Sequence, residues 1–281
     1  MKRLLDKIAV VTGANSGMGF ATAKALLDEG ATVIMLCRDE TRGKEAYNKL
    51  LEDGNGRTYL ILCDLGDYDS IRSFAAQVRD RFGRVDVLVN NAGFISLDRQ
   101  FTKEGVERQF GINHVGHFLL TNELLPVMPK GARIVTVASG AHKTGRIHFK
   151  DINLSKGFNV ITAYSQSKLA NVLFTRELAR RLAGRGITAN CCHPGAVATN
   201  IGIDRKTGFG KTITSLLKPF FLTPAEGADT AIFLATDDAV RDISGEYFYK
   251  RMIARSSRRS KDMKLAKRLW KFTEELIELR S

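Results

Sequence analysis

Short apolar runs alternate with longer amphipathic stretches from the first residues of the chain onward. Six of these runs predict strands: KIAVVTG, ATVIMLC, TYLILCD, VDVLVNN, RIVTVAS (133–139) and ITANCCHPG. A seventh strand is predicted at ISGEYFY, closer to the C-terminus. Because the runs are continuously apolar, they are typical of strands that are covered on both faces of a sheet.

The stretches between these strands have the length and the pattern of amphipathic helices. Helices are predicted over Met18–Glu29, Glu40–Glu52 and Ser70–Arg81, and a further helix carries Tyr164 and runs to about Ala183. Strands that alternate with helices predict parallel pairing, because each connection has to cross back over the sheet. The pattern therefore predicts an α/β fold: a doubly wound parallel sheet of about seven strands with helices on both faces.

No repeat, low-complexity segment or linker divides the chain. We expect a single domain over residues 1–249 and a basic, amphipathic C-terminal extension over residues 250–281. Apolar residues in the extension recur at spacings of four and three, as on one face of a helix: Leu265, Leu269, Phe272, Leu276 and Leu279. Packing on the parent domain or on a sister subunit is the first interpretation of this face. Peripheral contact with a membrane is the second, and nucleic-acid binding is the last.

Composition and charge narrow the class of protein without fixing its function. Of 281 residues, 44% are hydrophobic and 26% charged, as in ordinary soluble globular proteins. The net charge is +13, and the extension, with eleven Lys/Arg and four Asp/Glu, carries +7 of it. The apolar run Ile8–Val11 is too short for a signal peptide, and no run approaches the ~20 residues of a spanning helix. We therefore expect a soluble, cytoplasmic protein.

Neither the cysteines nor the histidines form a recognisable metal or disulfide pattern. Cys37, Cys63, Cys191 and Cys192 lack the spacings of disulfide frameworks and zinc sites, which favours reduced thiols. No carboxylate or cysteine completes a metal-ligand set with His193 or with the pair His114 and His117. We expect no metal site.

A glycine-rich turn, TGANSGMG (12–19), follows the first predicted strand and opens the first helix. Gly13, Gly17 and Gly19 would let the backbone turn tightly and approach a pyrophosphate. The N-terminus of the helix would then offer unpaired N–H groups and the positive end of its dipole. This turn, in this context, predicts a dinucleotide site.

The stretch YSQSK (164–168) places a phenol and an ammonium one helical turn apart. Tyr164 and Lys168 therefore point the same way. A free phenol titrates near ~10, so proton transfer near neutral pH requires a lower pKa. An adjacent ammonium favours the phenolate, which makes this pair a candidate acid–base site.

Over about residues 7 to 250 these motifs resemble the short-chain dehydrogenase/reductase family, with a Rossmann-like fold. The glycine spacing G-x3-G-x-G, the segments CDL, NNAG and HPGAVATN, and Tyr-x3-Lys carry the resemblance. Asp64 would then bond the adenine, NNAG would lie against the adenosine, and Thr199 would hold the nicotinamide carboxamide. The implied cofactor contacts are Gly13, Asn15, Ser16, Gly17, Met18, Gly19, Asp64, Leu65, Asn91, Ala92, Gly93, Tyr164, Lys168, Pro194, Gly195, Val197 and Thr199.

The resemblance also implies four catalytic residues. Tyr164 would be the general acid/base, and Lys168 would bond the ribose hydroxyls and favour the phenolate. Ser139 would bond and polarise the substrate oxygen, and Asn113 would help to hold a water in the proton path to the lysine. Met18 departs from the branched residue usual at its position.

The end of the second predicted strand indicates which nicotinamide cofactor is preferred. Members of the family that prefer NAD(H) place an acidic residue where Cys37 stands, to bond the ribose 2′-hydroxyl. Here Arg38 follows instead, and a guanidinium suits a 2′-phosphate. We therefore expect NADP(H) rather than NAD(H), although Asp39 is adjacent and Arg38 could simply be solvated.

Residues 138 to 200 resemble the retinol-dehydrogenase-like and WW-domain-oxidoreductase-like branch, which acts on lipophilic aldehydes, retinoids, steroids or other carbonyl compounds. The predicted substrate loop, about residues 200 to 222, is apolar: it contains Phe209, Leu216, Leu217, Phe220 and Phe221. Such a loop suits a hydrophobic substrate, or it simply packs on its own domain. Family members often dimerise through the helix that bears the tyrosine, so a homodimer is a further expectation.

The prediction is an NADP(H)-dependent alcohol dehydrogenase or carbonyl reductase acting on a lipophilic small molecule. The alternative is a catalytically silent protein on the same fold that senses NADP(H) or serves as a membrane adaptor. That alternative would be indicated by a missing catalytic residue, and all four are present.

Overall fold

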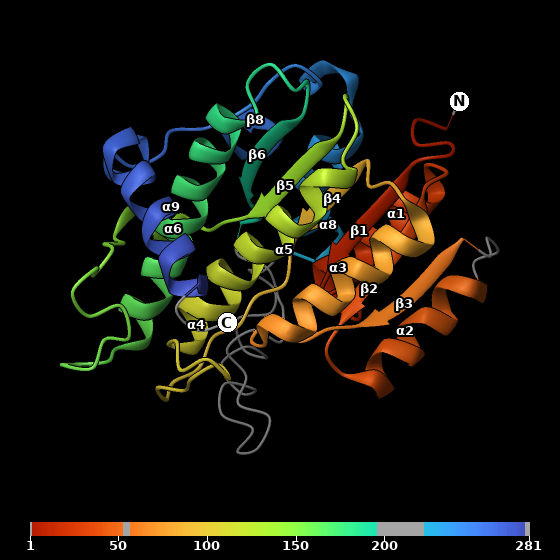
Figure 1. The fold of residues 1–281 in the computed structure, drawn as a ribbon. Coiled ribbons are helices and arrows are strands. Elements are labelled where there is room, and N and C mark those ends of the chain that lie inside the picture. Colours follow the sequence, from red (N-terminus) through yellow and green to blue (C-terminus); the bar gives the residue numbers. More distant parts are fainter. Residues whose placement is uncertain (1, 53–56, 196–221, 279–281) are drawn as a thin grey trace.

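The computed structural model describes residues 2–52, 57–195 and 222–278 (Figure 1). Within them one sheet has the strand order β3-β2-β1-β4-β5-β6-β7-β8. The strands are β1 (Ile8–Thr12), β2 (Thr32–Cys37), β3 (Thr58–Leu62), β4 (Val87–Asn90), β5 (Arg133–Val137), β6 (Thr188–His193), β7 (Tyr247–Tyr249) and β8 (Met252–Ile253).

The first seven strands are parallel, and each lies at one of the predicted runs. The eighth, β8, pairs antiparallel with β7 and is two residues long. Lys250 and Arg251 make the turn between them with φ of 49° and 60°. The prediction of about seven strands did not include β8, because two exposed residues leave no apolar run in the sequence.

Helices cover both faces of the sheet, as the alternating pattern predicted. On one face lie α1 (Gly17–Asp28), α2 (Glu40–Glu52) and α8 (Pro224–Thr236). The other carries α3 (Tyr68–Phe82), α4 (Arg108–Phe110), the π-helix η1 (Gly111–Gly116), α5 (His117–Leu124), α6 (Val160–Arg181) and α9 (Met263–Glu278). Short 3-10 turns are η2 (Leu125–Val127), η3 (Gly140–Lys143), η5 (Asp238–Val240) and η6 (Arg259–Lys261).

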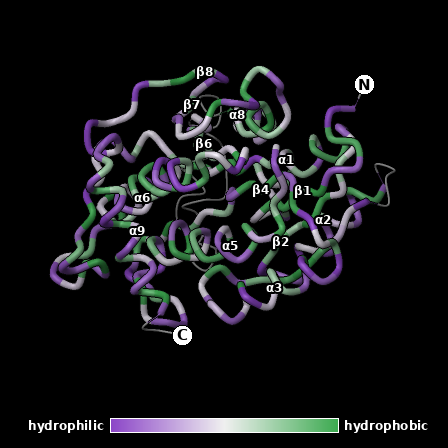
Figure 2. Tube along the Cα trace, turned by 45° about the horizontal axis from the view of Figure 1, so that its top comes forward, coloured by the Kyte–Doolittle hydropathy of each residue, from purple (hydrophilic) through white to green (hydrophobic). Residues whose placement is uncertain are grey.

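Successive strand residues enter the two hydrophobic layers in turn. In β1, Val10 packs toward α3 and α5, whereas Ala9 and Val11 pack toward α1 and α8. Burial on both faces is why these strands are continuously apolar. Figure 2 shows the hydrophobic residues concentrated in the strands and on the inner sides of the helices.

The extension beyond β8 ends in α9, which lies beside α6 of the same chain in Figures 1 and 2. Asp262 caps this helix by accepting bonds from the backbone N–H groups of Lys264 and Leu265. The ring of Trp270 packs on Phe118 and Phe174, with centroids 4.6 and 5.8 Å apart. The buried side of α9 consists of Ala266, Leu269, Trp270, Thr273, Leu276 and Ile277.

The predicted apolar stripe of the extension is confirmed in part. Leu269 and Leu276 are buried, Leu265 and Phe272 are partly buried, and Leu279 lies outside the described residues. No helix in the described part of the chain is both long and apolar enough to cross a membrane.

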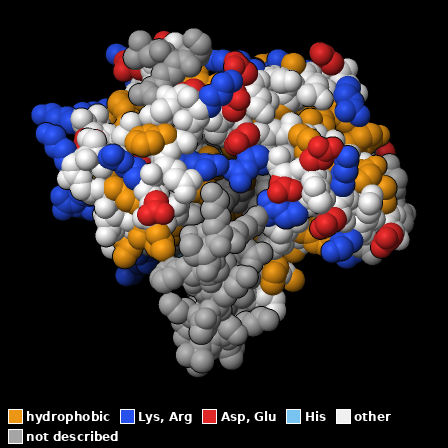
Figure 3. Space-filling model, turned by 90° about the horizontal axis from the view of Figure 1, so that it is seen from below, with side chains coloured by type: hydrophobic (Ala, Val, Ile, Leu, Met, Phe, Trp, Pro, Cys, Tyr) orange, Lys and Arg blue, Asp and Glu red, His pale blue; other side chains and the backbone are white. Residues whose placement is uncertain are grey.

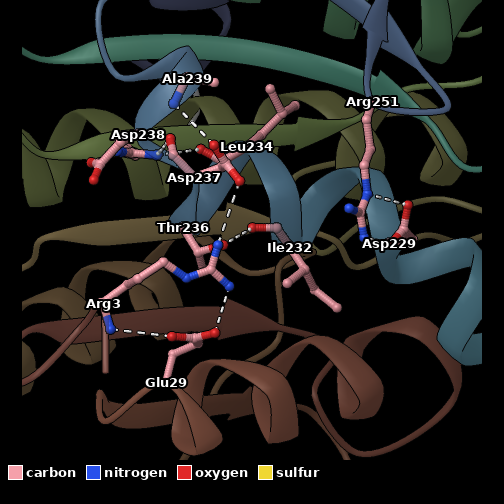
Figure 4. A network of polar contacts seen from close by, with 11 residues as sticks. Arg3, Glu29, Asp229, Ile232, Leu234, Thr236, Asp237, Asp238, Ala239 and Arg251 are labelled. Atoms are coloured by element: carbon pink, nitrogen blue, oxygen red, sulfur yellow. Dashed lines mark hydrogen bonds and ion pairs between the residues drawn. The ribbon is translucent and has the colours of Figure 1, made fainter. Parts of the chain in front are cut away.

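A polar network joins the amino-terminal segment to α8 (Figure 4). Arg3 bonds Glu29 at the end of α1 and lies 3.5 Å from Asp237 after α8. Arg133, the first residue of β5, donates to the backbone oxygen of Asp237 at 2.6 Å. Arg3 precedes β1 and Arg133 begins β5, so this network ties the amino ends of these two strands to the end of α8. The opposite, carboxyl ends of the strands are therefore available to form the site.

Candidate active site

A cleft of about 1210 Å³ lies at the carboxyl ends of the parallel strands. It is lined by the glycine turn after β1, by the ends of β2 and β4, and by the first turn of α6. Figure 3 views the molecule from this side and shows Lys and Arg side chains near the centre of the face. In open α/β sheets this edge is where ligands bind.

The glycine turn has the backbone geometry that the sequence predicted. Gly13 and Gly17 have φ of 66° and 55°, which side chains rarely tolerate. At Gly19 there is no room for a side chain, because a Cβ would lie 2.2 Å from the backbone oxygen of Gly13. Ser16, the N-cap of α1, makes no side-chain bond to the helix in the described structure. The turn can therefore receive an anion at the helix N-terminus.

Residues after β4 close around the glycine turn. The hydroxyl oxygen of Thr12 accepts the backbone N–H groups of Asn91 and Ala92 at 2.9 and 2.8 Å. The side chain of Asn91 donates to the backbone oxygen of Thr12 at 2.8 Å. Asn15, Ser16, Met18, Asp64, Leu65 and Gly93 also line the cleft. These predicted cofactor residues therefore share one surface.

Positive charge gathers where β2 ends. Arg38, Arg42 and Arg108 line the cleft. Asp39 is engaged by Arg42, which forms an ion pair with it at 3.0 Å and also donates its backbone N–H to it. Burial raises the pKa of the Cys37 thiol to about 12, so this group stays neutral. Burial lowers the pKa of Arg108, and the nearby Arg38 lowers it further.

Arg108 was not predicted from the sequence. Its guanidinium lies 4.7 Å from the centroid of the Phe94 ring and bonds Gln100 at 2.7 Å. Neither partner belongs to a motif, and all three are brought to the cleft by the chain that follows β4.

Tyr164 lines the cleft from the beginning of α6. Asn159 caps this helix by accepting the N–H groups of Ile161 and Thr162. Burial raises the pKa of Tyr164 above its usual value, and a side-chain hydrogen bond with Ser139 partly offsets that rise. The two residues predicted to touch the substrate oxygen therefore touch each other.

Lys168 lies one turn further along α6 and is buried behind Tyr164. Its Nζ donates to the backbone oxygen of Val137 at 3.0 Å and lies 5.6 Å from the centroid of the tyrosine ring. Burial lowers the pKa of Lys168 to about 8. The phenol pKa is raised rather than lowered as expected from the lysine, because burial disfavours the charged form of both groups.

Asn113 lies in the π-helix η1, a distortion often found at functional sites. Its Nδ2 donates to Ser167 Oγ at 3.1 Å, and Ser167 in turn donates to the backbone oxygen of Tyr164 at 2.8 Å. Its side chain also exchanges two bonds with the backbone of Phe94. Asn113 thus links α6 to the segment after β4.

His117 joins this asparagine to the glycine turn. Its Nδ1 lies 3.1 Å from the backbone oxygen of Asn113, and its Nε2 lies 2.9 Å from the hydroxyl of Thr12. Burial lowers the pKa of His117 to about 4, so the ring is neutral at physiological pH. No group of three or more His, Cys, Asp or Glu side chains in residues 2–52, 57–195 and 222–278 could hold a metal ion.

The predicted residues after β6 are only partly described. Pro194 and Gly195 follow this strand, and Gly195 has a φ of 87°. Neither lines the cleft formed by the described residues. Val197, Thr199 and the predicted substrate loop with Phe209, Leu216, Leu217, Phe220 and Phe221 lie outside the described residues.

The cleft beside Tyr164 has an apolar wall that the sequence did not reveal. It is formed by Phe94, Ile95, Leu97, Val160 and Ile161. Leu97 is 52% exposed and Ile161 69% exposed, so this wall leaves apolar surface uncovered. They come from two segments far apart in the sequence, so no local pattern predicted them.

Comparison with known proteins agrees with this geometry. Residues 7–208 match the family model of short chain dehydrogenases. Retinol dehydrogenase 14 of Homo sapiens is 41% identical over 97% of this chain and 87% of its own length.

Two solved structures share the fold. An uncharacterized protein from Mycobacterium paratuberculosis is 37% identical with a TM-score of 0.81, covering 99% of this chain and 96% of that one. A blue fluorescent protein from a metagenomic library, in complex with NADPH, is 29% identical with a TM-score of 0.71. That comparison covers 88% of this chain and 96% of the other.

Proposed function

The chain belongs to the short-chain dehydrogenase family, and we propose that it transfers a hydride between NADP(H) and a lipophilic alcohol or carbonyl compound, with Tyr164 as general acid/base. Membership makes it an NAD(P)-dependent alcohol dehydrogenase or reductase. The observation that carries the rest is one continuous cleft, which runs from the glycine turn and Arg38 to Tyr164 and an apolar wall.

The residues of the cleft fit a nicotinamide dinucleotide. The glycine turn would hold the pyrophosphate, Asp64 and Asn91–Gly93 the adenosine, and Lys168 the ribose of the nicotinamide. The positive φ of Gly13 and the close approach of Gly19 to the backbone oxygen of Gly13 support this assignment, because both belong to a tight turn at the N-terminus of a helix. When bound, the nicotinamide supplies or accepts the hydride.

NADP(H) is the proposed form of the cofactor. Arg38 lines the cleft, the neighbouring Cys37 is buried and neutral, and Asp39 is engaged by Arg42. Arginine is a permanent cation whose donor fork matches a phosphate. A related solved structure contains NADPH, which also supports the proposal.

Proton transfer is assigned to Tyr164. In reduction its hydroxyl would give a proton to the carbonyl oxygen while the carbonyl carbon gains the hydride, and in oxidation both steps reverse. Ser139, which already bonds Tyr164, would donate to the same substrate oxygen and polarise it. When its amine is charged, Lys168 would favour the phenolate form of Tyr164. Asn113 would hold α6 in position through its hydrogen bond to Ser167, which in turn bonds the backbone of Tyr164.

A lipophilic substrate is supported by two observations. Leu97 and Ile161 line the cleft and expose apolar surface. The relative with 41% identity is a retinol dehydrogenase. We infer that a long-chain or ring carbonyl compound packs against this wall.

The proposal is tested with a panel of all-trans-retinal, long-chain aldehydes, ketosteroids and short sugars, by following the absorbance of NADPH. We expect the lipophilic compounds to be reduced with a much higher kcat/KM than the sugars. Faster turnover of sugars would contradict the lipophilic assignment. Tight NADPH binding without turnover of any compound would favour the catalytically silent alternative.

Membrane contact through the extension stays a prediction, and the structure limits the side of α9 that could make this contact. The apolar side of α9 packs inside the protein, so only its charged side is available: Lys264, Lys267, Arg268 and Lys271 are all exposed. Any contact would therefore be electrostatic. Full-length protein should sediment with vesicles containing phosphatidylserine, and a variant with these four residues changed to Glu should not. Equal sedimentation of the full-length protein and this variant would contradict a membrane contact through α9.

A homodimer also stays a prediction. It could not use the part of α6 around Phe174, because Trp270 of α9 stacks on that ring with a centroid distance of 5.8 Å.

A further inference from the structure

His142 is a buried histidine that the proposed mechanism does not use. Its Nδ1 lies 2.7 Å from the backbone oxygen of Ser139. Its Nε2 accepts the backbone N–H of Ser257 at 3.2 Å. The ring packs on Tyr247 with a centroid distance of 4.7 Å. A single imidazole thus joins the proposed catalytic serine to a residue 118 positions away in the chain.

These two contacts fix the tautomer of the ring. A backbone N–H can only donate, so Nε2 must be unprotonated. The proton then lies on Nδ1, which donates to the carbonyl of Ser139. Both nitrogens are used, and neither bond would survive in the other tautomer.

The bond to Ser139 acts at the point where β5 ends and the substrate oxygen would bind. Ser139 has an extended backbone and caps the short turn η3, and its side chain bonds Tyr164. The direction of this side chain depends on how its own peptide is held. Arg259 adds a second contact, because it donates to the backbone oxygen of Gly145 at 3.3 Å. The same C-terminal segment, residues 254–278, therefore contacts the Ser139–Gly145 turn at His142 and at Gly145.

A second buried histidine joins this segment to Asn113. His114 follows Asn113 in the π-helix, and its Nε2 lies 3.1 Å from the hydroxyl of Thr273 in α9. That hydroxyl donates to the backbone oxygen of Leu269 at 2.8 Å, so its oxygen accepts the proton of Nε2. Nδ1 of His114 has no partner within the described residues. Within the described part of the chain, Thr273 is the hydrogen-bond partner of this ring, and aromatic rings pack around it.

We propose that the C-terminal segment, residues 254–278, positions two of the proposed catalytic residues, Ser139 and Asn113. Ser257 holds His142 in the tautomer that positions Ser139, and Thr273 holds His114 and with it the π-helix that carries Asn113. His142 and His114 are positioning residues, since neither touches the cleft. This proposal rests on the proposed function, which assigns Ser139 its role.

Three variants of His142 separate its two bonds. His142→Phe keeps the ring and loses both bonds; His142→Asn keeps a donor near the Nδ1 position; His142→Gln keeps an acceptor near the Nε2 position. A misplacement of about 1 Å in an active site can cost about 100-fold. We expect kcat to fall by about 10- to 100-fold in His142→Phe and nearly as much in His142→Gln. In His142→Asn, a loss of about three- to tenfold would reflect the missing bond to Ser257.

Two further readouts distinguish positioning from general damage. The dissociation constant of NADPH, measured by fluorescence titration, should stay unchanged in all three variants. Hydrogen exchange at the amide of Ser257 should become faster in His142→Phe and His142→Asn and stay slow in His142→Gln. Activity and exchange would then rank the variants differently, which a merely destabilised protein would not do.

Thr273→Val tests the second contact, with Thr236→Val as its control. Both threonines are buried and donate to a backbone oxygen four residues earlier, but Thr236 lies in α8. We expect kcat to fall by about threefold or more in Thr273→Val and to remain unchanged in Thr236→Val, although both lose some stability.

Wild-type kcat in both His142→Phe and Thr273→Val would overturn the proposal. So would equal losses in Phe, Asn and Gln together with weaker NADPH binding. Wild-type kcat in His142→Asn would overturn the part assigned to Ser257. If Tyr164→Phe is inactive while these variants are fully active, this inference alone fails; if Tyr164→Phe is active, the proposed function fails whatever His142 does.

Discussion

The two ends of the cleft hold their polar groups in opposite ways. At the β2 end, Arg38 and Arg42 carry permanent charges at the cleft surface. Behind the cleft surface near α6, Lys168, His117 and His142 are buried, and burial lowers the pKa of each. Charge at the first end suits the binding of an anion. At the second, proton affinity is set by burial and by single hydrogen bonds, which is what acid–base chemistry requires.

The largest effect should come from the α6 end. Tyr164→Phe removes the proposed acid/base and should lower kcat by about 10²- to 10⁴-fold. The dissociation constant of NADPH should stay within about threefold of wild type, because only one hydroxyl is lost. Stopped-flow and titration measurements check the two values. Near-native turnover of Tyr164→Phe would contradict the acid–base assignment. Loss of NADPH binding would mean that Tyr164 also contributes to cofactor binding, so that binding and proton transfer do not belong to separate ends of the cleft.

A steric change at the glycine turn should have the next largest effect and the opposite signature. In Gly19→Ala the new Cβ would meet the backbone oxygen of Gly13, so the turn must shift. We expect NADPH binding to weaken by about 100-fold, with kcat at saturating NADPH much less affected.

Gly184→Ala is the control for this change. Unlike Gly19, Gly184 has a positive φ, of 85°, and no atom lies within 4 Å of the added carbon, so this variant strains the backbone without a steric clash. It should lose some stability and keep its NADPH affinity. Equal affinity in the two variants would contradict the role of the turn.

Arg38→Gln should alter the choice of cofactor by a smaller factor. A charge-assisted bond is worth about 1.5–3 kcal/mol, so the preference for NADPH over NADH should fall by about 10- to 100-fold in kcat/KM. Arg42→Gln, which removes a guanidinium already paired with Asp39, should change the preference less. A preference for NADH in the wild type would reverse the assignment of Arg38.

The smallest effect concerns stability against pH. Burial lowers the pKa of His114 to about 3 and that of His117 to about 4, from an ordinary value near 6.5. Below pH 6.5 the unfolded chain therefore takes up protons that the folded chain does not, and the free energy of unfolding should fall as the pH decreases toward 4. Thermal unfolding between pH 7.5 and 4.5 measures this fall, and His114→Phe should make it shallower. An unchanged Tm over this range would contradict buried neutral rings.

The two ends also differ in how far the sequence predicted them. The glycine turn, Asp64 and Asn91–Gly93 stand at strand ends within short motifs, and the parallel sheet brings strand ends together. The pair Tyr164 and Lys168 was found because four residues make about one helical turn. In each case local spacing determined which residues would share a surface.

Other features depend on contacts between distant segments. Leu97 and Ile161 come from distant segments that both line the cleft, and Ser257 bonds His142 from a segment without a motif. The spacing of Tyr164 and Lys168 also said nothing about burial, which raises the pKa of the phenol and lowers that of the lysine. Proximity along a helix could be predicted from sequence, but the solvent accessibility of the pair could not.

The most direct test of the proposed chemistry is the fate of the hydride. All-trans-retinal is reduced with NADPH that carries deuterium on one face of nicotinamide C4, and then with NADPH labelled on the other face. We predict that one preparation yields an alcohol with one deuterium on the former carbonyl carbon and the other an unlabelled alcohol. Unlabelled product from both would contradict hydride transfer in this cleft.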